Sequence, residues 1–203
     1  MKASHLHVIV EDQSTEAALR VLLPKILRQD LTFEIFPHQC KQDLLKHLPN
    51  RFRGYKQWLP DDWRIIVLCD LDNDDCKQLK DRLESFAMQA RLMTKRSSSR
   101  GSYQVVTRLA IEELEAWFFG DWNAVCAAYP KVDPNLGAKQ GYRDSDSIAG
   151  GTWEALERAL KNGGYFRTGL RKIEAARAIS DQMDPLRNKS QSFDAFRKAV
   201  GDL

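Results

Sequence analysis

The run WRIIVLCD at residues 63–70 most constrains the fold, because its apolar residues follow one another without polar alternation. A strand with one face in water alternates apolar and polar side chains, whereas a strand that is covered on both faces does not. Strands of the second kind occur in parallel sheets with helices on both sides. The run therefore predicts a central parallel strand in an α/β fold.

Three further runs are typical of strands, and amphipathic segments separate them. A helix is expected after the first strand, capped by Ser14 or Thr15 and kinked or restarted at Pro24. A short helix at 42–48 and a loop at 49–62 are expected next. The predicted strands, besides 63–70, are LHVIV (6–10), LTFEIF (31–36) and YQVVTRLA (103–110). A strongly amphipathic helix is predicted at 75–93, between the last two strands. This order predicts a Rossmann-like, mainly parallel four-stranded sheet flanked by helices.

The last part of the chain is expected to be helical. The segment EELEAWFFGDWNAVCAAY predicts helix in two pieces around Gly120, and a long loop rich in Pro, Gly, Asp and Ser occupies 129–151. Helices are predicted near 152–162, 170–180 and 191–201. We therefore divide the chain into an α/β domain at 1–128 and, at 129–203, a long loop with a helical extension packed on that domain.

Composition excludes several classes of protein. No apolar run approaches the roughly 20 residues that span a bilayer, and the acidic start is unlike a signal peptide, so we expect a cytoplasmic protein without membrane contact. The four cysteines form no CxxC pair, which disfavours a zinc site built on cysteine. Neither a P-loop nor a GxGxxG motif occurs, and a net charge of +3 does not by itself indicate nucleic-acid binding.

Acidic side chains follow three of the predicted strands. Glu11 follows the first, and Asp70 and Asp72 follow the third. The carboxyl ends of parallel strands share one edge of a sheet, so these carboxylates should meet there, together with Glu112, Glu113 and Glu115. Clustered carboxylates favour a hard cation such as Mg²⁺. The alternative is helix capping, which we assign to Asn73, Asp74 and Asp75.

Four short motifs, taken in order, resemble a known family. These are VIVEDQSTEAALRVLL, VLCDLDNDD, IEELEAWFFGD and SQSFDAF. They are similar to a bacterial TOPRIM-related family of unknown function, whose members commonly read V-E-G-x-T-E near the start. The TOPRIM fold is shared by topoisomerases, bacterial primases, recombination-repair proteins and overcoming-lysogenization-defect nucleases.

The resemblance implies roles for individual residues. Glu11 matches the TOPRIM glutamate, a metal ligand or general acid–base, and Asp70 and Asp72 match the metal-binding Asp-x-Asp pair. Glu115 matches the acidic position ahead of a tryptophan and would complete a site for Mg²⁺ or Mn²⁺. Asp12 departs from the family, which has glycine there, and a carboxylate opposes the close approach of phosphate.

Three functions are consistent with these residues. The first is a metal-dependent phosphoryl-transfer enzyme, a nuclease acting on DNA or RNA, for which the resemblance suggests phage defence. The second is a non-catalytic TOPRIM-like scaffold that binds a partner such as a separate ATPase. The third is a receiver-like signalling domain, because HVIVEDQ is typical of the start of a response regulator.

Other polar residues have both functional and structural interpretations. Arg108 can bind phosphate or pair with Glu112, and Arg167 and Lys172 flank a glycine-containing segment, NGGYFRTGLRK, that can bind phosphate. The alternative for that segment is a helix end at Gly163 followed by a loop. The remaining residues are expected to be structural: His5 and His7 in the core, and Ser190, Ser192 and Phe193 at the start of the last helix.

Overall fold

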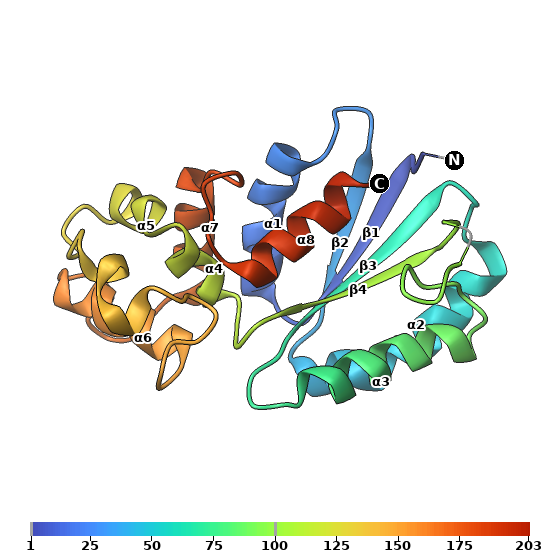
Figure 1. Ribbon diagram of the computed structural model, residues 1–203, viewed down its shortest axis with the longest axis horizontal. Coiled ribbons are helices and arrows are strands. Elements are labelled where there is room, and N and C mark those ends of the chain that lie inside the picture. Colours follow the sequence, from blue (N-terminus) through green and yellow to red (C-terminus); the bar gives the residue numbers. More distant parts are fainter. Residues whose placement is uncertain (1, 100) are drawn as a thin grey trace.

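The computed structural model describes residues 2–99 and 101–203, and it contains a parallel four-stranded sheet (Figure 1). The strands lie in the order β2-β1-β3-β4, and each neighbouring pair is parallel. This confirms the predicted Rossmann-like α/β fold. The strands are β1 (His5–Val10), β2 (Thr32–Pro37), β3 (Trp63–Asp70) and β4 (Val105–Ala110).

Three helices connect the strands: α1 (Gln13–Ile26), α2 (Lys41–Trp58) and α3 (Cys76–Gln89). Figure 1 shows α2 and α3 on one face of the sheet and α1 on the other. In β3, Ile65 and Val67 pack into the apolar cluster beneath α2 and α3, whereas Ile66 and Leu68 pack into the cluster on the opposite face. Burial on both faces is the reason that this strand lacks polar alternation.

The remaining α-helices are α4 (Glu115–Gly120), α5 (Trp122–Ala128), α6 (Thr152–Asn162), α7 (Lys172–Gln182) and α8 (Gln191–Gly201). Two 3₁₀ helices, Leu136–Ala138 and Gln140–Tyr142, lie in the long loop. Figure 1 shows α4, α5 and α6 beyond the carboxyl end of β4, while α8 returns beside α1 on the sheet. The helix α7 packs against α1, and α8 packs against β4. One apolar cluster therefore runs from the sheet into the C-terminal helices. Within the described residues, none of the helices has both the length and the apolar character needed to cross a membrane.

The predicted break at Pro49 is wrong. A single helix covers both the predicted helix at 42–48 and most of the predicted loop at 49–62. Proline removes one hydrogen bond and usually ends a helix. Here Phe52 and Tyr55 continue the buried face of α2 beyond the proline, so tertiary burial outweighs the local cost.

The start of α1 also differs from the prediction. The helix begins at Gln13, and the Asp12 carboxylate accepts the Thr15 backbone N–H at 2.8 Å. Asp12 is therefore the cap, in place of Ser14 or Thr15. Pro24 lies within the last turn of α1, and no second helix starts there.

The late SQSFDAF motif holds the C-terminal half together. Ser190 caps α8 by accepting the Phe193 backbone N–H, as predicted, and the Trp117 indole donates to Ser192 Oγ at 2.9 Å. Asp146, from the long loop, accepts hydrogen bonds from both serine hydroxyls and from the backbone N–H groups of Gln191 and Ser192. The motif thus joins α4, α8 and the loop.

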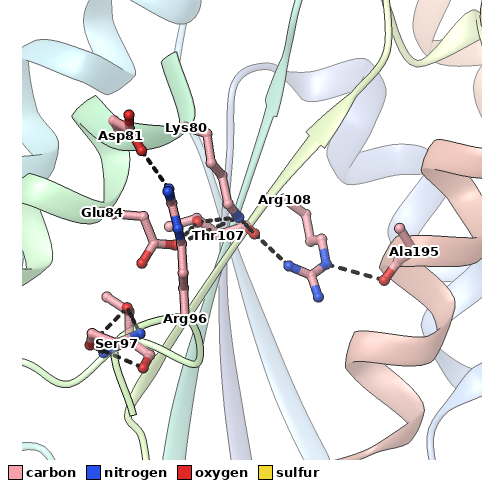
Figure 2. A network of polar contacts seen from close by, with 9 residues as sticks. Lys80, Asp81, Glu84, Arg96, Ser97, Thr107, Arg108 and Ala195 are labelled. Carbon is pink, nitrogen blue, oxygen red and sulfur yellow. Dashed lines mark hydrogen bonds and ion pairs between the residues drawn. The ribbon is translucent and has the colours of Figure 1, made fainter. Parts of the chain in front are cut away.

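A polar network covers the free edge of β4 (Figure 2). The Thr107 carbonyl accepts from Lys80 Nζ and from Arg108 Nη1, and the Thr107 hydroxyl donates to the buried Glu84. Arg108 Nε also donates to the Ala195 carbonyl of α8 at 3.1 Å. Arg108 is therefore engaged at the side of the sheet, and the expected pairing with Glu112 is replaced by these contacts.

This network predicts a pH dependence of stability. Burial, and then the charge of Arg108, lower the pKa of Lys80 from 10.5 to about 8. Between these values the folded protein has released a proton that the unfolded chain still holds, so the free energy of unfolding rises with pH. In urea denaturation, Lys80→Met should lack a rise on the order of 1–3 kcal/mol across this window. The exposed Lys77→Met is the control, and equal slopes for both variants and wild type would contradict the prediction.

The Asp146 contacts predict a second stability effect. Asp146→Ala leaves the hydroxyl and N–H groups at the start of α8 without their charged acceptor, and should lower the free energy of unfolding by about 2 kcal/mol. Chemical denaturation monitored by circular dichroism measures this. Asp61→Ala, at an exposed position, should stay within about 0.5 kcal/mol of wild type. A similarly small change in Asp146→Ala would show that the loop does not stabilise α8.

Candidate functional site

The candidate site lies between the carboxyl ends of β1 and β3. From β1 the chain continues through α1 to β2 on one side, and from β3 it continues through α3 to β4 on the other. Such a switch point leaves a crevice in which ligands of open α/β sheets bind. Glu11 directly follows β1, and Asp70 is the last residue of β3.

Glu11 and Asp70 are directly joined. Glu11 Oε2 accepts the Asp70 backbone N–H at 3.1 Å, and the Cys69 thiol donates to the same oxygen at 3.4 Å. Burial, followed by the charges of Glu11 and Glu115, raises the pKa of Asp70 well above its ordinary value. Burial also raises the pKa of Glu11, against the hydrogen bond from Asp70. Two desolvated carboxyl groups therefore compete for a proton or a cation.

Asp72 occupies a strained turn that β4 supports. Its φ of 46° lies in the left-handed region, and its N–H donates to the Glu112 carbonyl at 2.7 Å. The Leu71 N–H donates to the Ala110 carbonyl at the end of β4. These two bonds fix the turn that follows Asp70. Asp75, at the end of the same acidic run, caps α3 by accepting the Gln78 N–H, as predicted.

Lys41 is a site residue that the sequence analysis missed. Its Nζ lies 2.6 Å from Asp72 Oδ2 and 2.9 Å from Asp74 Oδ2, and it donates to the Leu71 carbonyl at 3.0 Å. Desolvation lowers the pKa of Lys41, but the hydrogen bonds that Lys41 donates to Asp72 and Asp74 outweigh it, so the pKa is raised. The available signal was its place in the chain, because α2 begins there, just beyond the carboxyl end of β2.

Glu115 and Lys172, from the C-terminal helices α4 and α7, lie at the same edge of the sheet. Glu115 is 3% exposed in the first turn of α4, and burial raises its pKa to about 7. Lys172 Nζ, from the first turn of α7, lies 3.8 Å from Glu115 Oε1 and 5.0 Å from the centre of the Trp153 ring. The predicted phosphate ligand Lys172 therefore lies among carboxylates, whereas Arg167 is exposed in the loop that precedes α7.

Two further acidic residues have structural partners. Glu113 Oε2 accepts from Thr152 Oγ1 at 3.1 Å and from the Trp153 N–H at 3.0 Å, so it caps α6. Asp12 caps α1 with an extended backbone, φ −150°, which any residue adopts. The glycine of the resembling family is therefore not required at this turn for its conformation. The Asp12 carboxylate also accepts from Ser14 Oγ at 2.6 Å.

These contacts decide how well the edge suits a divalent cation. Glu11 and Asp70 fit, because both are desolvated carboxylates. The lysines at this edge pair instead with Asp72, Asp74 and Glu115. Asp72 must leave Lys41 before it can act as a ligand. Among the described residues, the compact groups of potential ligands, with donor atoms within 4.8 Å of one another, lie elsewhere: His5, His7 and Glu34, and His38, Asp43 and His47.

A groove of about 760 Å³ opens beside the turn of Asp72. One wall carries Asp72, Glu112 and Glu113, and the other is formed by the end of the long loop and the start of α6, residues 147–154. Burial, and then the charge of Glu113, raise the pKa of Glu112. The negative character of this groove favours a cation or a ligand that brings one.

Comparison with known proteins identifies the family and leaves the activity open. No curated protein and no solved structure matches the chain. One family model, described as a domain of unknown function (DUF4276), matches residues 10–201, which include the acidic edge, strands β2 to β4, the last residue of β1 and the helices α1 to α8. The chain therefore belongs to the DUF4276 family of domains of unknown function.

Proposed function

We propose that the protein is a divalent-metal-dependent phosphoryl-transfer enzyme, specifically a TOPRIM-type nuclease that acts on DNA or RNA. The proposal depends on one observation. Glu11 and Asp70 are hydrogen-bonded neighbours at the switch point of the sheet, and both have raised pKa values. Two desolvated carboxylates without a positively charged partner are costly unless a cation binds them. A divalent cation bound there can assist phosphoryl transfer.

The ligands of an Mg²⁺ or Mn²⁺ ion would be Glu11 and Asp70, joined by Glu115 and by Asp72 after its release from Lys41. The ion supplies charge stabilisation for a phosphoryl oxygen and lowers the pKa of bound water. Glu115, with a pKa of about 7, is suited to hold or release a proton near neutral pH. Lys172 limits the negative charge of the edge before the metal and substrate bind.

Nucleic acid would approach from the side of α7. Lys172, Arg171 and the exposed Arg167 lie in one basic segment next to the acidic edge, and they can contact phosphates there. Arg108 is omitted from this role because Thr107 and Ala195 already engage its guanidinium. The role in phage defence is supported only by the resemblance to overcoming-lysogenization-defect nucleases.

A second candidate function is a non-catalytic scaffold that binds a partner protein, such as a separate ATPase. The observation that favours it is the 2.6 Å ion pair between Lys41 and Asp72. A lysine in place of a metal neutralises one member of the Asp-x-Asp pair without any cofactor. The two candidates differ in whether a metal displaces this lysine.

Nuclease assays test the first candidate. Purified protein with Mg²⁺ or Mn²⁺ should cleave labelled single- or double-stranded DNA or RNA. Asp70→Asn and Glu11→Gln should each reduce cleavage roughly 10²–10⁴-fold, because each removes an anionic ligand at the switch point. Asp61→Asn is the control, since Asp61 is an exposed carboxylate that precedes β3, at the opposite end of the strand from Asp70.

Circular dichroism must show that each variant is folded. Cleavage that persists in Asp70→Asn and Glu11→Gln would contradict the assigned site. Absence of cleavage by folded wild-type protein, on every substrate and with either metal, would instead favour the scaffold.

Titration calorimetry with Mg²⁺ distinguishes the two roles of Lys41. Lys41→Met removes the competing cation from Asp72, and should tighten Mg²⁺ binding about tenfold, equivalent to about 1.4 kcal/mol of removed repulsion. Lys46→Met, exposed on the same helix, should leave the affinity unchanged. Weaker binding in Lys41→Met than in wild type would show that Lys41 supports the metal site.

A further inference from the structure

Two histidines and a glutamate gather on β1 and β2, nearer the amino ends of the strands than the acidic edge. His5 and His7 are two residues apart on β1 and therefore point to the same face of the sheet. Glu34 on β2 is the register partner of His7. The arrangement places three potential ligands on two paired strands, with backbone positions that the ladder fixes.

Their donor atoms converge. His7 Nε2 lies 3.6 Å from Glu34 Oε2, and the donor atoms of all three residues lie within 4.8 Å of one another. His5 Nε2 is buried and has no hydrogen-bond partner. A buried ring nitrogen without a partner is costly and requires an explanation.

The opposite ring nitrogens are held by hydroxyl groups. His5 Nδ1 is 2.6 Å from Thr32 Oγ1, and His7 Nδ1 is 2.8 Å from the Tyr55 hydroxyl. Metal-binding histidines characteristically use one nitrogen for the ion and the other for such a supporting contact, which fixes the orientation of the ring. Here both Nδ1 atoms are engaged, which leaves both Nε2 atoms for an ion, and His7 Nε2 faces the Glu34 carboxylate group.

We propose that His5, His7 and Glu34 form a binding site for a transition-metal ion of the Zn²⁺ class, with water as a fourth ligand. Ligands about 2.0–2.1 Å from zinc in a tetrahedral site lie about 3.3–3.4 Å apart, so the 3.6 Å separation of His7 and Glu34 needs little adjustment. Imidazole nitrogen selects this class of metal over Mg²⁺. The Glu34 side chain is 62% exposed, which gives the ion access from solvent.

Aromatic rings enclose the buried side of the site. The rings of Phe36 and Trp63 lie 4.8 Å and 5.1 Å from the His7 ring, and they exclude water from it. Arg51 acts against a bound cation, because its guanidinium lies over the Phe36 ring at 4.7 Å. The site should therefore bind its metal more tightly when this charge is removed.

Occupation of the site would link β2 to β1. The edge strand β2 is partly exposed along its length, and Glu34 is one of its outward residues. A metal bound by Glu34 and the two histidines would connect side chains of the two strands in addition to their backbone hydrogen bonds. The site is separate from the acidic edge and does not depend on the proposed phosphoryl transfer.

Metal-free full-length protein can be titrated with Zn²⁺ against a chromophoric chelator, with excess Mg²⁺ present to occupy the acidic edge. Wild type should bind one Zn²⁺ that Glu34→Gln and His5→Gln lose. Tyr55→Phe, which removes only the supporting hydroxyl, should weaken binding roughly 10–100-fold. His47→Gln is the control because it alters the other histidine group, and Arg51→Met should strengthen binding.

Co²⁺ substitution provides a second measurement. The wild-type protein should show the visible absorption of a four-coordinate site, and Glu34→Gln should lose it, with circular dichroism confirming its fold. The proposal is overturned if wild type binds no Zn²⁺, or if Glu34→Gln and His5→Gln bind it as wild type does. It is also overturned if only His47→Gln loses the ion, which would assign the metal to His38, Asp43 and His47.

Discussion

The burial of β3 on both faces is the constraint on which the rest of the structure depends. Ile65 and Val67 require a cover from α2 and α3, while Ile66 and Leu68 require one on the opposite face. Helices cover both faces because they form the crossover connections between parallel strands, and the carboxyl ends of all the strands therefore lie at the same edge. The clustering of carboxylates from β1, β3 and the segment after β4 is a consequence of this packing. Stability of the core and concentration of charge are thus imposed by one arrangement.

The protein balances this concentrated charge unevenly. Lys41 pairs with Asp72, and Lys172 approaches Glu115. The Glu11 carboxylate instead accepts from two neutral donors, the Cys69 thiol and the Asp70 backbone N–H, and within the described part of the chain neither Glu11 nor Asp70 has an ion-pair partner. The unbalanced pair lies at the position where open α/β sheets bind ligands. Two lysines from different helices thus leave a small part of the edge available to an external cation. The pairing of lysines with some carboxylates and not with others distinguishes this edge from a group of acidic side chains on a solvated surface.

The sequence predicted what depends on local periodicity and strand order, and it missed what depends on distant partners. The apolar run of β3 and the helices α6 and α8 were predicted with their observed bounds. The meeting of the acidic residues at one edge followed from parallel topology alone. By contrast, the helix through Pro49 depends on burial of Phe52 and Tyr55, which local rules do not include. The pairing of Lys41 with Asp72 joins residues that only the folded sheet brings together.

The link between Asp146 and the start of α8 has a mechanical consequence. Residues 147–151 form part of one wall of the acidic groove, and Asp146 anchors their beginning to Ser190 and Ser192. The wall is therefore tied to the start of the last helix, and the Trp117 indole ties the same turn of that helix to α4. A ligand that displaced the wall would have to move or break the hydrogen bonds between Asp146 and the start of α8.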